Sequence, residues 1–92
     1  MEDGRSHIPN RLKKYRRIAG YSQKEVAKIL GFRSTGRISR WEKGVSMPSL
    51  KNLLKLSFLY STLPAELYAD LWDDVRKELG TKKLEQFKED NM

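Results

Sequence analysis

Two short helices separated by a tight turn are predicted between residues 22 and 48, and this pattern constrains the fold more than any other part of the chain. Ser22 is a favourable N-cap and Glu25 stands three residues later, so the pair can form a capping box that starts a helix at Gln23. Apolar residues then recur with helical spacing at Val26, Ile29 and Leu30. Gly31 can adopt the positive φ that ends a helix, so we expect this helix to be short.

A second short helix is expected to follow, with Ser34 as its N-cap and Gly44 at its end. Ile38 and Trp41 repeat at i, i+3 and are expected to face the interior. The outward face then consists of small, hydroxyl and basic residues, namely Thr35, Gly36, Arg37, Ser39, Arg40 and Lys43. A face of this composition suits the major groove of DNA.

These residues resemble the Cro/C1-type (Xre-like) helix-turn-helix DNA-binding domains of bacteria and their phages. The resemblance covers about residues 8 to 67 and rests on Leu12, Arg16, Gly20, Ser22, Gln23, Val26, Ala27, Gly31, Ile38, Ser39, Trp41, Glu42, Gly44, Pro48 and the stretch from Leu53 to Leu56. The family usually has five residues between the turn glycine and the inward aliphatic residue, whereas six separate Gly31 from Ile38 here, and we place the extra residue in the turn at Phe32 and Arg33. The resemblance implies an all-α, lambda-repressor-like fold that binds double-stranded DNA.

Within that resemblance, Arg40 is the first choice for a base contact, because a guanidinium can donate two hydrogen bonds to the O6 and N7 atoms of guanine. The alternative for Arg40 is to lie along the phosphate backbone. The other candidates for base contacts are Thr35, Gly36, Arg37 and Ser39. The candidates for phosphate contacts are Gln23, Lys24, Arg33, Lys43 and Ser46, each with a solvated surface role as its alternative.

A structural ion pair is also implied by the resemblance. Glutamates at the position of Glu42 pair in this family with arginines at the position of Arg16, which ties the first helix to the third. Trp41 is assigned to the core rather than to base stacking.

Five helices and no strand are expected along the chain, which gives an all-α, five-helix domain with an extra C-terminal helix. The first begins at residues 8 to 10, has Leu12, Tyr15 and Ala19 on its inner side, and ends at Gly20; the fourth spans residues 50–60 and the fifth 64–80. We therefore divide the chain into a flexible arm (1–7), a helix-turn-helix domain (8–62), a C-terminal helix (63–80) and a charged, frayed tail (81–92).

The net charge of +7 is unevenly distributed, since residues 1–60 carry 14 Lys or Arg against 4 acidic residues while residues 61–92 carry 5 against 8. The basic part coincides with the expected DNA-binding domain, although surface lysines also serve to keep a small domain soluble. The chain has no cysteine and no long apolar run, so we expect a cytoplasmic protein without a membrane span, disulfide, metal or cofactor. No catalytic constellation is present, and the one histidine, His7, falls in the expected arm, so an enzyme is not predicted.

The C-terminal third leaves two alternatives open. Apolar residues that need a cover are Phe58, Leu59, Tyr68, Leu71 and Trp72. Either the last helix, which carries Tyr68, Leu71 and Trp72, folds back over Phe58 or Leu59 within one chain, or these residues form the interface of a homodimer, which would place two recognition helices on one DNA.

The predicted function is sequence-specific binding of double-stranded DNA by a transcriptional regulator, a repressor of the phage, mobile-element or antitoxin type. The alternative is a protein-interaction module on the same fold, an antitoxin or adaptor that binds a protein partner such as a toxin and contacts DNA weakly or not at all.

Overall fold

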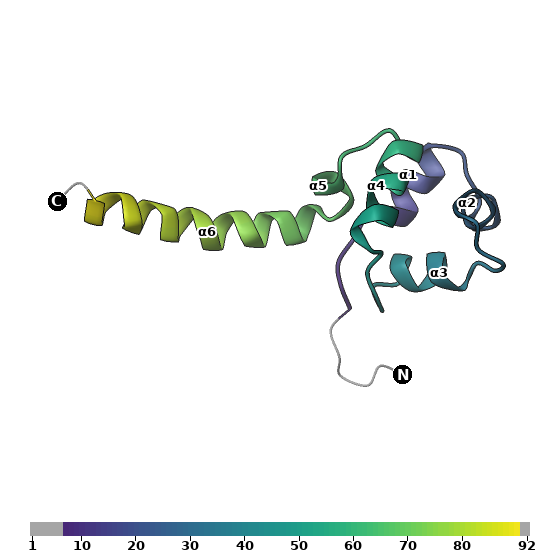
Figure 1. Cartoon of the computed structure of the whole chain (residues 1–92), viewed down its shortest axis with the longest axis horizontal. Coiled ribbons are helices and arrows are strands. Elements are labelled where there is room, and N and C mark those ends of the chain that lie inside the picture. Colours follow the sequence, from purple (N-terminus) through teal and green to yellow (C-terminus); the bar gives the residue numbers. More distant parts are fainter. Residues whose placement is uncertain (1–6, 91–92) are drawn as a thin grey trace.

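Six α-helices build the protein in the computed structural model, which describes residues 7–90. Their bounds are α1 Leu12–Ile18, α2 Gln23–Leu30, α3 Gly36–Glu42, α4 Leu50–Leu59, α5 Pro64–Leu67 and α6 Ala69–Asp90, and no strand occurs among the described residues. Figure 1 shows α1 to α5 gathered into one domain, from which α6 projects as a long single helix. The all-α fold class predicted from the sequence is confirmed, with six helices in place of five.

The hydrophobic core lies entirely within the domain of α1 to α5 and the turns that join them to their neighbours. Its buried residues are Leu12, Val26, Ala27, Ile38, Trp41, Leu56, Tyr60, Leu67 and Tyr68. Burial of each large apolar side chain contributes about 1.5–3 kcal/mol of transfer free energy. Every helix of the domain supplies at least one of these residues, and α6 supplies none.

The start and the end of α2 agree with the prediction. Ser22 Oγ accepts a hydrogen bond from the Glu25 amide at 3.0 Å, and Glu25 accepts one from the Ser22 amide at 2.8 Å. The Ser22 amide, which donates to the carboxylate, holds the pKa of Glu25 below its usual range because this bond favours the ionised form, and the Ser22 hydroxyl acts in the same direction. Gly31 ends the helix with φ of 85°. The predicted stripe is partly wrong, since Ile29 is exposed and the buried face is formed by Val26 and Ala27.

The first helix begins at Leu12, so the predicted start at residues 8 to 10 is wrong. The Asn10 side chain explains the later start, because its Oδ1 accepts a hydrogen bond from the Leu12 amide at 3.0 Å. Its Nδ2 donates to the carbonyls of Trp41 and Glu42 at 3.1 and 3.2 Å. Asn10, which precedes Arg11 at the N-cap position, therefore bonds the first amide of α1 and holds the segment before it against the end of α3. Ala19, expected on the inner side of α1, is exposed.

Gly44 allows this N-terminal segment to pack closely. It has φ of 77°, and its carbonyl accepts a hydrogen bond from the Ile8 amide at 2.9 Å. A Cβ atom at residue 44 would lie 2.3 Å from the Ile8 carbonyl oxygen, which no side chain can tolerate. The recognition helix itself starts one residue later than predicted, with Thr35 rather than Ser34 at the N-cap position, and Ser34 Oγ accepts from the Gly36 amide at 3.4 Å.

The predicted fifth helix is divided, because the backbone at Tyr68 leaves the helical region between α5 and α6. The helix that follows does not end at Gly80 but continues to Asp90, so the predicted frayed tail is helical over residues 81–90. The stretch from Lys82 to Gln86 contains only strong helix formers, and a single glycine costs about 1 kcal/mol against them. Residues 1–6 of the predicted arm and residues 91–92 lie outside the described residues.

Among the helices of residues 7–90, none combines the length and the apolar character that crossing a membrane requires. The described side chains also form no group of three or more His, Cys, Asp or Glu residues that could hold a metal ion.

Candidate nucleic-acid interface

The turn between α2 and α3 is fixed by Phe32. Its amide donates a hydrogen bond to the Ala27 carbonyl at 2.8 Å, which continues the pattern that ends α2. Its half-buried ring meets the Trp41 ring edge-on, with the centroids 5.8 Å apart. The longer turn predicted at Phe32 and Arg33 thus has one residue packed inward and one exposed.

The recognition helix α3 presents a continuous outward face. Ile38 and Trp41 are buried at 1% and 5% exposure. Helical periodicity places Gly36, Ser39, Arg40 and Lys43 on the opposite side, where all but the half-buried Ser39 are exposed. Thr35 and Arg37 lie on the two flanks of this face.

Arg33 and Arg37 are brought together around Phe32. The Arg37 guanidinium lies 4.8 Å from the centroid of the Phe32 ring, a distance typical of a cation–π contact. Both arginines line one shallow hollow with Phe32 and Ser34. Two positive charges therefore lie together at this place, Arg33 in the turn and Arg37 in the first turn of α3.

Arg16 and Glu42 form the ion pair that joins α1 to α3. Arg16 Nε donates to Glu42 Oε2 at 2.6 Å and Nη2 to Oε1 at 3.1 Å, and the two side chains are only 8% and 4% exposed. The hydrogen bond to Glu42 raises the pKa of Arg16 above its ordinary value. Arg16 Nη1 also donates to the Tyr21 carbonyl at 2.9 Å, so the same guanidinium holds the turn before α2.

Gln23, a candidate for a phosphate contact, belongs to the same network. Its Nε2 donates to Glu42 Oε1 at 2.9 Å, which ties the first turn of α2 to α3. Lys24 is exposed beside it in the first turn of α2. The remaining phosphate candidates follow α3: Lys43 is exposed at its C-cap, and Ser46 is half-buried in the next loop.

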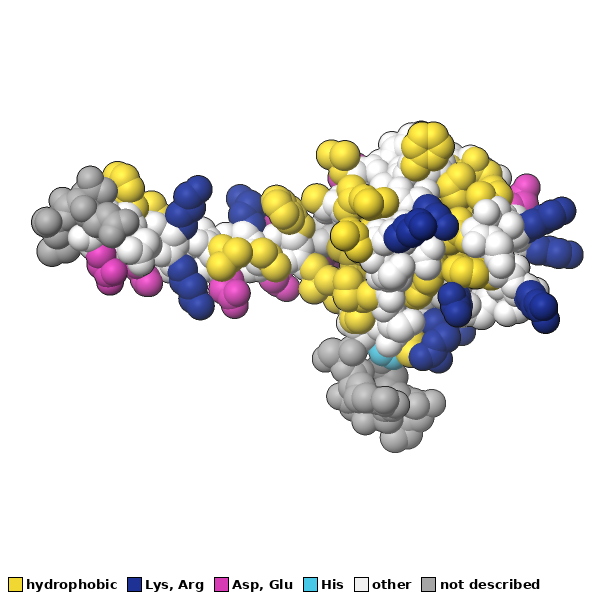
Figure 2. Space-filling model, viewed as in Figure 1, with side chains coloured by type: hydrophobic (Ala, Val, Ile, Leu, Met, Phe, Trp, Pro, Cys, Tyr) yellow, Lys and Arg dark blue, Asp and Glu magenta, His cyan; other side chains and the backbone are white. Residues whose placement is uncertain are grey.

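The charge around this face is almost entirely positive. Residues 7–63 contain thirteen Lys or Arg and two acidic residues, Glu25 and Glu42, and both acids are bonded within the domain. On the side of the molecule drawn in Figure 2, Lys and Arg side chains gather around the end of the domain formed by α2 and α3, whereas most acidic side chains lie along α6. The domain therefore has a basic surface that attracts anions, and few carboxylates are present to pair with its lysines and arginines instead.

The apolar residues of the C-terminal third are not gathered into one cluster. Phe58 is 85% exposed, so a C-terminal helix folded over it is contradicted, while Leu59 is half-buried against the core. Tyr68, Leu71 and Trp72 line a separate groove at the root of α6.

Asn10 and Phe32 are structural residues whose contributions sequence reasoning missed. As an ordinary N-cap, Asn10 would start a helix at Arg11, one residue before the observed start at Leu12. The contact of Asn10 with the end of α3 spans more than 30 residues and has no local signal.

Comparison with protein-family models matches residues 12–61 to a model described as helix-turn-helix. No curated protein and no solved structure matches the chain. The matched segment covers more than half of the chain, begins at the first residue of α1, and includes every candidate DNA contact.

Proposed function

The chain belongs to the Cro/C1-type helix-turn-helix family of DNA-binding domains, and from that premise we propose that it regulates transcription by binding a specific double-stranded DNA site in the cytoplasm. The observation that carries the proposal is the outward face of α3, where Gly36, Ser39 and Arg40 stand opposite the buried Ile38 and Trp41.

Arg40 reads a base in this proposal. It is exposed in the last turn of α3, and its guanidinium matches the paired acceptors of guanine. Ser39 and Thr35 supply hydroxyl groups beside it, and Gly36 permits a close approach of the helix to the groove. The Arg37 guanidinium lies over the Phe32 ring in the free protein, and on DNA it contacts either a base edge or the phosphate backbone.

Phosphate contacts fix the register of the domain. Arg33, Lys24, Lys43 and Ser46 surround the base-reading face and follow the two strands, while Gln23 adds a contact at the start of α2. The regulator acts as a repressor of the phage, mobile-element or antitoxin type, because occupation of an operator by a DNA-binding domain is sufficient to block a promoter.

The test is fluorescence anisotropy of the protein on a duplex from its own promoter region and on random duplexes, at about 50 and 200 mM salt. We expect the specific site to bind much more tightly than random DNA, with a loss of roughly a thousandfold across that salt range if six to ten phosphates are contacted. Arg40→Ala should cost about 1–3 kcal/mol and relax the preference at one base position.

Arg76→Ala is the matched control, since it removes the same charge from the exposed surface of α6. It should leave the preference for the specific duplex unchanged. Equal, weak binding of all duplexes by the unaltered protein would contradict sequence-specific recognition.

A second candidate, the protein-interaction module, is favoured by one observation. The exposed Phe58 lines an apolar hollow of about 500 Å³ with Ile29, Leu30, Leu54 and Leu59, and Lys51 and Lys55 flank it. This combination suits an acidic segment with apolar anchors on a protein partner such as a toxin. Such binding should survive Arg40→Ala and be lost with Phe58→Ser, as measured by calorimetric titration with an acidic amphipathic peptide.

A further inference from the structure

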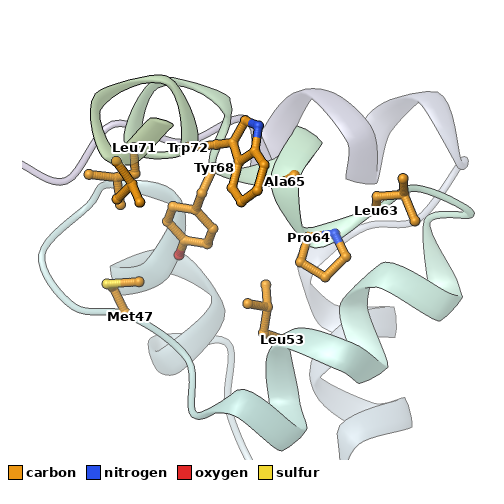
Figure 3. A pocket seen from close by; sticks show the side chains of 9 residues that line it. Met47, Leu53, Leu63, Pro64, Ala65, Tyr68, Leu71 and Trp72 are labelled. Carbon is orange, nitrogen blue, oxygen red and sulfur yellow. The ribbon is translucent and has the colours of Figure 1, made fainter. Parts of the chain in front are cut away.

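The concave surfaces of the protein differ in chemistry. The groove at the root of α6 is lined by apolar and aromatic side chains, and none of them is charged (Figure 3). The hollow beside the turn between α2 and α3 has a volume of about 400 Å³ and is lined by Gly31, Phe32, Arg33, Ser34 and Arg37. Two of these residues are cations, so this hollow is suited to an anion.

The Phe32 ring is held in place from the side of the core. The Phe32 amide donates a hydrogen bond to the Ala27 carbonyl at 2.8 Å, and the ring meets the buried Trp41 ring edge-on, with the centroids 5.8 Å apart. The side chain is only half-buried, so part of the ring also lines the hollow. The turn therefore presents a fixed aromatic surface to a neighbouring side chain.

Arg37 occupies this aromatic surface. Its guanidinium lies 4.8 Å from the ring centroid, within the range of about 6 Å over which a cation is attracted to the face of an aromatic ring. Ordering a long, freely rotating side chain weakens binding by roughly two- to tenfold. Because Phe32 restricts Arg37 before DNA arrives, part of that ordering is already complete in the free protein.

The two arginines of the hollow are not neutralised within the described part of the chain. Neither Arg33 nor Arg37 forms an ion pair with a described acidic residue. The two acids of residues 7–63, Glu25 and Glu42, are bonded elsewhere in the domain. Two like charges at one hollow repel each other, and an anion bound between them offsets that repulsion.

We propose that Phe32 is a positioning residue, which directs Arg37 to one phosphate of the DNA backbone that Arg33 and the Ser34 hydroxyl also contact. The Ser34 Oγ accepts from the Gly36 amide at 3.4 Å, so its hydrogen is free to donate to a phosphate oxygen. This inference rests on the proposed DNA binding, and it assigns Arg37 to a phosphate rather than to a base edge.

The direction of Arg37 supports this assignment. Arg37 precedes the buried Ile38 and therefore lies on the flank of α3. Arg40 and Lys43 stand on the outward face instead. The contact with Phe32 holds the guanidinium beside the turn, at the edge of the face that would enter a groove, where the phosphate backbone passes.

The longer turn between Gly31 and Ile38 supplies both parts of this arrangement. Phe32 packs inward against Trp41 and provides the ring, while Arg33 is exposed and provides the second cation. The additional residue of the turn thus has a role in binding the DNA backbone.

The test is the salt dependence of binding, measured by fluorescence anisotropy on a mixed-sequence duplex of about 20 base pairs and on a duplex from the promoter region. Arg37→Ala should weaken binding roughly five- to tenfold at about 0.1 M salt and lower the slope of log Kd against log salt by about 1. The loss should be equal on the two duplexes, because every sequence has the same phosphates. Arg76→Ala in α6 is the control and should change neither value.

Phe32→Leu tests the positioning role, because leucine keeps the turn apolar and has no aromatic face. It should weaken binding to both duplexes roughly two- to tenfold and leave the salt slope almost unchanged, since Arg37 keeps its charge. In a chain that already carries Arg37→Ala, the same substitution should have no further effect. Phe32→Tyr retains the ring and should bind like the unaltered protein.

Circular dichroism should show the same helix content for every variant, and Phe32→Met replaces Phe32→Leu in the comparison if the leucine variant loses helix. An equal loss of affinity with and without Arg37 would overturn the positioning role, because the effect would then come from the fold. An unchanged salt slope for Arg37→Ala, or a larger loss on the promoter duplex, would contradict the phosphate contact. If the unaltered protein bound neither duplex at about 50 mM salt, the proposed DNA binding would itself be wrong, and this inference with it.

Discussion

The domain of α1 to α5 and the projecting helix α6 each contain an arginine–carboxylate pair, and the two pairs differ mainly in their surroundings. Arg16 and Glu42 are 8% and 4% exposed and join two helices, whereas Arg76 and Asp73 are 66% and 52% exposed and lie one helical turn apart. In the domain, tertiary contacts hold the helices in place. In α6, the helix is held mainly by the helix propensity of its own residues. An arginine–carboxylate pair is therefore expected to contribute more to the free energy of unfolding in the domain than in α6.

The largest expected effect comes from removing one partner of the buried pair. Glu42→Ala leaves the Arg16 charge and the Gln23 amide without their acceptor, and should lower the free energy of unfolding by about 3–5 kcal/mol. Asp73→Ala, the matched change in α6, should cost less than about 1 kcal/mol. Urea unfolding followed by circular dichroism measures both.

If Glu42→Ala and Asp73→Ala lowered the free energy of unfolding by similar amounts, the distinction between the two regions would be wrong. A stable Glu42→Ala protein would also contradict it, since it would mean that the contacts among α1, α2 and α3 do not depend on this ion pair.

The second largest loss of stability is expected when a buried leucine of the domain is truncated, and the comparison is with an exposed leucine of α6. Leu67 in α5 is completely buried, whereas Leu84 in α6 is 63% exposed. Leu67→Ala should cost about 2–5 kcal/mol through lost burial and the cavity it leaves, while Leu84→Ala should change stability by less than about 0.5 kcal/mol. Thermal unfolding of both variants gives the comparison, and a large loss with Leu84→Ala would show that α6 packs on that side as well.

The smallest change in the free energy of unfolding at neutral pH is expected for a substitution at Tyr68, which lies between α5 and α6. Its hydroxyl is buried and has no hydrogen-bond partner among the described residues, and burial raises the pKa of Tyr68 to about 12. Because the folded pKa lies above the value of about 10 for an unfolded tyrosine, this group favours the folded state fully below pH 10 and loses that contribution as the pH rises towards 12.

Tyr68→Phe should therefore leave stability at pH 7 unchanged or slightly higher and should reduce the loss of stability between about pH 10 and 12. Unfolding curves at a series of alkaline pH values test this. Tyr15→Phe is the control, because the Tyr15 hydroxyl contacts Glu66 at the surface. A marked loss of stability with Tyr68→Phe at pH 7 would instead reveal a hydrogen bond to water.

The features of the fold that could be predicted from the sequence are those set by near neighbours. The capping box of Ser22 and Glu25 and the positive φ of Gly31 depend on residues within one turn, and both are present. The start of α1 and the break at Tyr68 could not be found in this way. Asn10 contacts the end of α3, and Tyr68 packs in the core, so both depend on the tertiary arrangement.

The same division applies to the candidate interface. Burial of Ile38 and Trp41 follows from helical periodicity and leaves Arg40 outward. The hydrogen bond of Gln23 to Glu42 depends on how α2 approaches α3, and the position of Arg37 over Phe32 depends on the turn conformation. Neither contact has a signature in the local sequence.

The close approach of Ile8 to Gly44 has a practical consequence for labelling. Because that contact fixes the start of the described chain beside the end of α3, a dye or purification tag joined ahead of His7 begins next to the proposed DNA surface. The far end of α6 is remote from that surface in Figure 1. Reporters for the binding measurements therefore belong on the outer side of α6, near Leu84.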